Sequence, residues 1–346
     1  MRIVFVGLSI TSSWGNGHAT NYRSLTRALR ERGHDVTFLE RDVPWYASQR
    51  DAPGAGELYE SLDDLDRHAD LVREADLVVL GSYVPEGVAV GQWIFDTARG
   101  AIAFYDIDTP VTLAKLEAGD DEYLSAELVP RFDLYLSFTG GPTLEKLEHE
   151  WGARRARAFY CLVDERAYRP LDVEKRWLLG YLGTYSEDRQ PAVERLLLAA
   201  ARALPGEHFV VAGPQYPEEI AWPANVERIE HLPPAEHPRF YAQQRFTLNV
   251  TRAAMTEAGW SPSVRLFEAA ACGVPVISDR WSGLDRFFVP GDEILIAETT
   301  EDVLRHLQHP EPAAIGRRSR ARVLAEHTAA HRAEQLERYV AELVHA

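Results

Sequence analysis

Residues 260–279 read WSPSVRLFEAAACGVPVISD, and this stretch decides much of the predicted fold. Ser261 is a suitable N-cap, and the proline that follows it suits the first position of a helix. Gly273 fits the position just after a helix, and the proline two residues later prevents continuation. We therefore expect a helix over residues 262–272 that leads directly into a buried strand over residues 274–278.

The same alternation of short apolar runs, glycine-containing loops and helical patterns extends through the chain. It begins with a strand at residues 3–6, a helix that stops at Gly33, and a second strand at residues 36–39. Further buried strands are expected at residues 77–80, 101–105, 134–137, 178–182, 208–212 and 246–250. Alternating strands and helices indicate an α/β fold with parallel sheets, whose ligand sites lie at the carboxyl ends of the strands.

The pattern becomes irregular at residues 163–173, between two α/β series of similar size. We therefore expect two Rossmann-like domains facing a cleft, because clefts between domains are preferred ligand sites. The boundaries are residues 1–165 for the first domain and 166–326 for the second. Residues 327–346 are predicted to form a helix that packs back on the first domain.

The composition is that of a soluble globular protein: 346 residues, 46% hydrophobic and 26% charged, with a formal net charge of -16. This acidity argues against binding to duplex nucleic acid, because affinity for phosphates comes mainly from Lys and Arg. The chain has only two cysteines and no long apolar run, so we expect a cytoplasmic protein without a transmembrane segment. Basic clusters at residues 154–157 and 317–322 are interpreted as solvated helix faces, with weak peripheral membrane contact as the alternative.

The helix predicted at 262–272 has features of an anion site. Its N-terminal residues, among them Ser263 and Val264, offer free backbone N–H groups at the positive end of the helix dipole, which suits a phosphate. Arg265 is a candidate to neutralise a diphosphate oxygen, and Glu268 is a candidate to accept hydrogen bonds from a ribose diol. The alternative for this pair is an ordinary surface ion pair three residues apart.

The string RLFEAAACGVPVI, residues 265–277, resembles the donor-binding helix of GT-B glycosyltransferases in the large retaining family 4, and more closely a CgeB-like branch. The resemblance is strong over residues 178–300 and is limited to the fold over the N-terminal half. It implies transfer from a nucleoside-diphosphate sugar, with a UDP-sugar favoured, to an acceptor hydroxyl. It also implies retention of anomeric configuration and no metal or other cofactor. The second domain would hold the donor and the first the acceptor.

The resemblance extends to further donor-binding candidates in the second domain. Arg189 and Arg252 are candidates for gripping the diphosphate, although a solvated arginine at a helix start explains Arg189 equally well. Leu232 lies in a proline-rich turn that corresponds loosely to the loop that binds the base, and turn chemistry alone also accounts for it. The remaining candidates follow predicted strands: Gly183, Thr184, Tyr185, Gly213, Pro214 and Asn249.

One position departs from the family pattern. Eight residues before Glu268 the family has a second glutamate that approaches the donor sugar, whereas this chain has Trp260. Two alternatives stay open, and this departure motivates the first. One is a non-catalytic protein that binds nucleotide-sugars, and the other is a different GT-B enzyme, such as a sugar-nucleotide epimerase.

The loop after the first strand contains Gly15 and Gly17, which allow a close approach of backbone to a ligand. It lacks the full dinucleotide-binding fingerprint. By resemblance, this loop approaches the donor phosphates and the acceptor, so His18 is a candidate catalytic residue. An ordinary loop histidine is the alternative.

Asp106 and Asp108 form an Asp-x-Asp motif at the end of a predicted strand. This spacing is a metal signature in GT-A glycosyltransferases, where carboxylates hold a divalent cation against a diphosphate. The GT-A alternative leaves the helix with Arg265 and Glu268 unexplained. We therefore expect one of the two aspartates to face the acceptor or the donor sugar across the cleft, with turn capping as the structural alternative.

Overall fold

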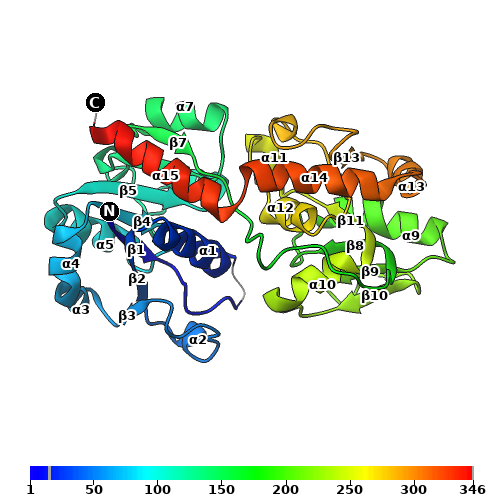
Figure 1. Cartoon of the computed structure of the whole chain (residues 1–346), viewed down its shortest axis with the longest axis horizontal. Coiled ribbons are helices and arrows are strands. Elements are labelled where there is room, and N and C mark those ends of the chain that lie inside the picture. Colours follow the sequence, from blue (N-terminus) through cyan, green and yellow to red (C-terminus); the bar gives the residue numbers. More distant parts are fainter. Residues whose placement is uncertain (15–16, 345–346) are drawn as a thin grey trace. The chain divides into compact units, whose positions relative to one another are not determined.

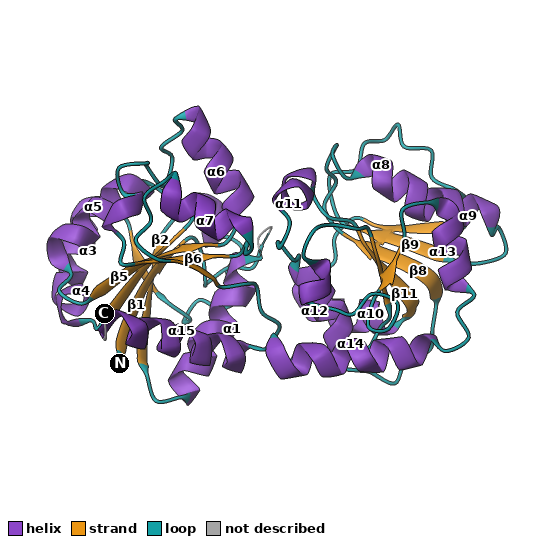
Figure 2. Cartoon of the chain, turned by 90° about the horizontal axis from the view of Figure 1, so that it is seen from above, coloured by secondary structure: helices purple, strands orange, loops and turns teal. Residues whose placement is uncertain are grey.

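The computed structural model describes residues 1–14 and 17–344 and divides the chain into two units (Figure 1). Unit 1 consists of Met1–Leu162 together with Ala329–Ala346, and unit 2 consists of Val163–Thr328. Each unit is built around its own parallel sheet with helices on both faces (Figure 2). Both sheets are therefore of the kind that is buried on both sides.

The sheet of unit 1 has the strand order β3-β2-β1-β4-β5-β6-β7, and all its pairings are parallel. Its strands are β1 (Arg2–Gly7), β2 (Asp35–Arg41), β3 (Glu57–Tyr59), β4 (Leu77–Gly81), β5 (Ala101–Asp106), β6 (Leu134–Ser137) and β7 (Ala156–Ala158). Its helices are α1 (His18–Glu31), α2 (Pro44–Ala47), α3 (Leu62–Leu65), α4 (Ala69–Glu74), α5 (Gly87–Thr97), α6 (Thr109–Ala118), α7 (Pro142–His149) and α15 (Ala329–Val344).

Alternate residues of the strands in unit 1 enter separate cores on the two faces of the sheet. Val4 and Val6 of β1 belong to one cluster, and Ile3 and Phe5 belong to the other, as the two-residue period of a strand requires. The second cluster also contains apolar residues of α15, among them Leu336. The last helix of the chain therefore completes the core that its first strand begins.

The sheet of unit 2 has the order β10-β9-β8-β11-β12-β13, again with parallel pairings. Its strands are β8 (Trp177–Leu182), β9 (Phe209–Ala212), β10 (Val226–Ile229), β11 (Gln244–Asn249), β12 (Val276–Ser278) and β13 (Leu295–Ile296). Its α-helices are α8 (Gln190–Val193), α9 (Ala199–Ala203), α10 (His237–Ala242), α11 (Ala253–Ala258), α12 (Val264–Ala271), α13 (Thr300–Leu307) and α14 (Pro312–Glu326).

The α/β fold class predicted from the sequence is confirmed, and one local prediction, the extent of the helix at residues 262–272, needs correction. One helical run continues from α8 to α9, but its middle, Glu194–Leu198, is a π-helix. The helix predicted at residues 262–272 begins at Val264 and ends at Ala271, with Cys272 as its C-cap. None of the helices within residues 1–14 and 17–344 combines the length and the apolar character needed to cross a membrane.

Candidate active site

Helix α12 starts where the sheet of unit 2 presents the ends of its central strands. Ser263, and not Ser261, is the N-cap, and its hydroxyl donates to Oδ1 of Asn249 at 2.9 Å instead of capping the helix. Asn249 is the last residue of β11 and is fully buried. The first turn of α12, including the half-exposed Val264, therefore keeps backbone N–H groups available for an anion. Ser261, two residues before this N-cap, is buried.

Arg265 is fixed at the carboxyl end of β8. Its Nε donates to the carbonyl of Leu182, and its Nη1 donates to Oδ1 of Asn249 at 3.1 Å. Its guanidinium also lies over the ring of Tyr181, 5.1 Å from the ring centroid. These contacts hold the side chain in place, and the positively charged guanidinium group can still pair with an anionic ligand.

Three arginines gather in this part of unit 2. Arg189 donates from Nη2 to the carbonyl of Thr184 at 2.6 Å, whereas its Nε is buried without a hydrogen-bond partner among the described residues. Burial lowers the pKa of Arg189, and the nearby charges of Arg265 and Arg252 lower it further. Clustered like charges are unfavourable unless an anion offsets them, so this cluster points to an anionic ligand.

The loops that follow β8 and β9 pack closely against each other and are connected by hydrogen bonds. Gly213 has a φ of 138°, and a Cβ at this position would lie 2.1 Å from the carbonyl oxygen of Gly183. Only glycine fits such a close backbone approach. Tyr185 N donates to the carbonyl of Pro214 at 3.0 Å, and Tyr216 OH donates to the carbonyl of Gly183 at 3.1 Å. The predicted donor residues in these two loops therefore form one continuous surface.

Glu268 lies in the interior side of α12 and is only 7% exposed. Its Oε2 accepts a hydrogen bond from Tyr241 OH at 3.2 Å and lies 4.0 Å from Nδ1 of His237. The other ring nitrogen of His237 is 3.2 Å from the carbonyl oxygen of Leu232. His237 thus lies between the candidate ribose-binding carboxylate and the candidate base-binding loop. Neither His237 nor Tyr241 was expected from the sequence, because neither residue belongs to a recognisable motif.

Arg265 and Glu268 are engaged by different partners, so the structure does not arrange them as a simple surface ion pair. Trp260, at the position of the missing glutamate, has a left-handed φ of 41°. Its backbone N–H donates to the carbonyl of Ser282 at 2.7 Å, and its ring packs so closely that a Cβ on Gly283 would be 2.5 Å away. Trp260 therefore fixes this loop against the segment after β12.

The candidate catalytic residues of unit 1 lie at the carboxyl edge of its sheet. His18 opens α1 after the exposed Gly17, and its ring makes an edge-to-face contact with Tyr83 at 5.5 Å between centroids. Tyr83 OH donates to Oδ2 of Asp108 at 3.2 Å. Burial lowers the pKa of His18 to about 4, which leaves its imidazole neutral near pH 7. Gly15 is outside the described residues.

Tyr83 was missed by the sequence analysis. It follows β4 and has a φ of 63°, a conformation that bulky side chains rarely adopt. Such strain persists only where the surroundings enforce it, and it is common at functional sites. The only sequence signal was its place just after a buried strand.

Of the two aspartates, one of which was expected to face a substrate, Asp106 is not exposed to one. It is completely buried and accepts hydrogen bonds from Tyr135 OH at 2.6 Å and Thr112 Oγ1 at 2.7 Å. Its carboxylate also accepts from the backbone N–H of Asp108 at 3.3 Å. Burial raises the pKa of Asp106 to about 6, despite these hydrogen bonds. The buried carboxylate of Asp106 therefore holds the backbone of Asp108 in position.

Within the described part of the chain, no group of three or more His, Cys, Asp or Glu side chains is arranged to hold a metal ion. The Asp-x-Asp motif does not present two carboxylates to one point, because Asp106 is turned into the core and Asp108 is bonded to Tyr83.

Comparisons with known proteins agree with the fold. Residues 189–338 match a family model described as glycosyl transferase-like, whereas no curated protein matches the chain. Over 99% of this chain, the fold resembles sucrose-phosphate synthase from Thermosynechococcus elongatus, with a TM-score of 0.68, 14% identity and 99% of that chain covered.

Two other solved structures are similar over 99% of this chain, each at 14% identity. Anabaena Alr3699/HepE in complex with UDP and glucose has a TM-score of 0.72 and is fully covered. An alpha-glucosyltransferase in complex with UDP-glucose and DNA containing an abasic site has a TM-score of 0.74 and is 99% covered. Residues 189–338 therefore match a glycosyl transferase-like family model, and the chain over its whole length has the GT-B fold of these solved structures.

Proposed function

We propose that the protein transfers a sugar from a UDP-sugar to an acceptor hydroxyl, with retention of configuration and without a metal ion. Unit 2 binds the donor, and unit 1 binds the acceptor. The observation that carries the proposal is the gathering of Arg189, Arg252 and Arg265 beside the uncapped first turn of α12. Complexes of similar folds with UDP or UDP-glucose support the choice of donor.

The arginine cluster supplies the main chemical requirement of the reaction. The departing nucleoside diphosphate gains negative charge as the glycosidic bond breaks, and the sugar develops oxocarbenium character. Arg265 is held ready by Leu182 and Asn249, so it stabilises this charge without reorganising during the reaction. Arg189 adds a second cation, and the N–H groups of α12 add a third source of positive potential.

Glu268 is the proposed ribose partner. A buried carboxylate that is oriented by Tyr241 and lies near His237 is well suited to accept hydrogen bonds from a diol. The Leu232 carbonyl, which is linked to the same histidine, is the proposed contact for the base. His18 and Asp108 are proposed to contact the acceptor or the donor sugar, with Asp106 as a positioning residue. The leaving phosphate takes the acceptor proton, as the family resemblance implies.

The test begins with thermal shifts in UDP, GDP, TDP and ADP, followed by turnover of the corresponding sugars with and without EDTA. We expect UDP to give the largest shift and EDTA to leave turnover unchanged. Loss of turnover in EDTA that Mg²⁺ or Mn²⁺ restores would overturn metal independence.

One observation favours a second candidate, a nucleotide-sugar binder without catalytic activity. Trp260 takes the place of the glutamate that the related family directs toward the donor sugar, and its ring packs against Gly283. The binder is the correct assignment if UDP-sugars bind but are neither transferred nor hydrolysed with any acceptor. Interconversion of the donor sugar itself would instead indicate an epimerase.

A further inference from the structure

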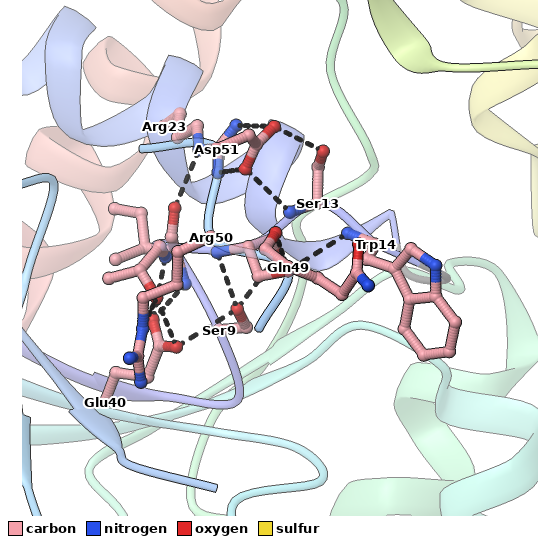
Figure 3. A network of polar contacts seen from close by, with 11 residues as sticks. Ser9, Ser13, Trp14, Arg23, Glu40, Gln49, Arg50 and Asp51 are labelled. Atoms are coloured by element: carbon pink, nitrogen blue, oxygen red, sulfur yellow. Dashed lines mark hydrogen bonds and ion pairs between the residues drawn. The ribbon is translucent and has the colours of Figure 1, made fainter. Parts of the chain in front are cut away.

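The loop after β1 is anchored by a buried carboxylate that the proposed reaction does not use. Glu40, the penultimate residue of β2, is completely buried (Figure 3). It accepts hydrogen bonds from the backbone N–H groups of Ile10 at 2.6 Å and Thr11 at 2.8 Å, and from Thr11 Oγ1 at 2.7 Å. A buried charge with this many donors fixes the geometry of the groups around it.

A second carboxylate extends this rigid region toward the end of the loop. Asp51 accepts hydrogen bonds from Ser13 N at 3.1 Å and Ser13 Oγ at 2.6 Å, and it forms a two-pronged ion pair with Arg23. Ser12 Oγ donates to the carbonyl of Gln49 at 2.9 Å. The backbone N–H of Trp14 donates in turn to Ser12 Oγ at 3.3 Å. The network therefore holds the loop up to Trp14.

The network ends in an exposed aromatic ring. Trp14 is 50% exposed, and its indole points away from the network in Figure 3. The neighbouring loop, which is tied to the same network through Gln49, carries Trp45 on α2, and this residue is 56% exposed. Exposed tryptophans on a rigidly supported loop are a sign of a binding surface, because burial of each ring on binding releases water from a large apolar face.

The two loops belong to one edge of unit 1. They follow β1 and β2, which are adjacent and parallel, and Ala52 N donates to the carbonyl of Thr11 at 3.0 Å. This is also the edge at which His18 begins α1. The same loops carry partly exposed carboxylates: the side chain of Asp51 is 49% exposed and that of Asp42 is 34% exposed.

We propose that Trp14 and Trp45 form a stacking surface for the acceptor, and that the acceptor is a carbohydrate. This inference rests on the proposed function and names its acceptor class. A pyranose ring offers an apolar C–H face with slightly positive hydrogens, which suits the negative face of an indole, and a rim of hydroxyl groups. Exposed carboxylates such as Asp51 can accept hydrogen bonds from that rim. A lipid surface fits less well, because the chain carries a net charge of -16 and the arginines at this edge are paired with acids.

The test measures carbohydrate binding and nucleotide binding on the same samples. Maltohexaose, laminarihexaose, mannohexaose and chitohexaose are each titrated into the full chain with saturating UDP, and binding is followed by calorimetry and saturation-transfer NMR. We expect at least one oligosaccharide to bind, and Trp14→Ala and Trp45→Ala each to weaken its affinity by about tenfold. Trp14→Tyr, which keeps an aromatic face, should restore most of the affinity. Val289→Ala removes an exposed apolar side chain in unit 2 and should change nothing.

Failure of this inference differs from failure of the proposed function. If UDP binds and no oligosaccharide does, or if both alanine variants bind within twofold of wild type, the stacking surface is refuted and the donor site stands. If an oligosaccharide binds through the tryptophans and no nucleotide binds, the stacking surface stands and the proposed function fails. Binding to vesicles of phosphatidylcholine and phosphatidylglycerol that both alanine variants abolish would assign the surface to lipid and overturn the inference.

Discussion

Replacement of Arg189 by methionine should weaken UDP binding while leaving the unliganded protein about as stable as before. Arg189 donates a hydrogen bond from Nη2 to the carbonyl of Thr184, and its Nε is buried without a hydrogen-bond partner among the described residues. Arg265 and Arg252 lie close enough to lower its pKa, in addition to the effect of burial. The arginine is therefore poorly accommodated until an anion arrives.

The two effects on stability have opposite signs. Loss of the hydrogen bond to Thr184 costs about 1.5–3 kcal/mol, and removal of an unsatisfied buried polar group returns about 1–3 kcal/mol. Because the two ranges overlap, the free energy of unfolding should change by no more than about 2 kcal/mol in either direction. In the complex, loss of one charge-assisted contact with the diphosphate costs about 1.5–3 kcal/mol, which corresponds to about 10- to 100-fold weaker binding.

Calorimetry with UDP and with uridine, together with urea denaturation, measures both quantities. The affinity for uridine should not change, because uridine carries no phosphate. Arg202→Met removes an arginine of unit 2 that is paired with Glu194, and it serves as the matched control. The reasoning is refuted if Arg189→Met binds UDP within twofold of wild type, or if uridine binding falls as much as UDP binding.

Three further predictions follow from the described geometry. Glu268→Gln should weaken UDP about tenfold and 2′-deoxy-UDP much less, by calorimetry; equal losses would remove the ribose assignment. Burial holds the folded-state pKa of Asp106 at about 6, above its unfolded value near 3.8. The folded state therefore favours the protonated carboxyl group, and the contribution of Asp106 to the free energy of unfolding falls as the pH rises from about 4 to about 6. The total loss is at most about 3 kcal/mol. In denaturation experiments, the free energy of unfolding of Asp106→Asn should therefore fall less than that of wild type between pH 4 and pH 6. An equal fall in both proteins would contradict the raised pKa of Asp106. Gly283→Ala should lower the free energy of unfolding by about 2 kcal/mol or more, because φ at this position is 84° and the new methyl group would clash with the Trp260 ring. A change below about 0.5 kcal/mol in denaturation curves would contradict this prediction and show that the loop rearranges at little cost.

The sequence patterns predicted the central strands well, because these strands are continuous apolar runs bounded by glycine and polar residues. The edge strands β3, β7, β10 and β13 were missed. They are short, and several of their residues are partly or fully exposed, so they lack a clear apolar pattern. Pairing to a neighbour, rather than their own composition, makes them strands.

The start of α12 was misplaced for a different reason. Ser261 followed by a proline is a good local start signal, but the decisive contact is the hydrogen bond from Ser263 to Asn249, fourteen residues earlier in the chain. The burial of Asp106 also depends on distant residues, because Tyr135 and Thr112 come from β6 and α6. A single sequence does not reveal which hydroxyl groups will surround a carboxylate.

The candidate site was predictable where one helix carries it and less so where several elements meet. Arg265 and Glu268 stand in a recognisable string, whereas His237, Tyr241 and Tyr83 contribute through contacts across the fold. The arrangement of Arg189 beside Arg252 and Arg265 likewise arises from loops that meet at the ends of neighbouring strands.

The return of the chain to unit 1 in α15 has a consequence for biosynthesis. Because unit 1 is completed by residues from Ala329 onward, the whole of unit 2 is an insertion in its sequence. A nascent chain that has emerged as far as Leu162 still lacks Leu336 and the other α15 residues that cover Phe5 and its neighbours. During translation, unit 2 can therefore complete its core first. The core of unit 1 is completed only after α15 has been translated.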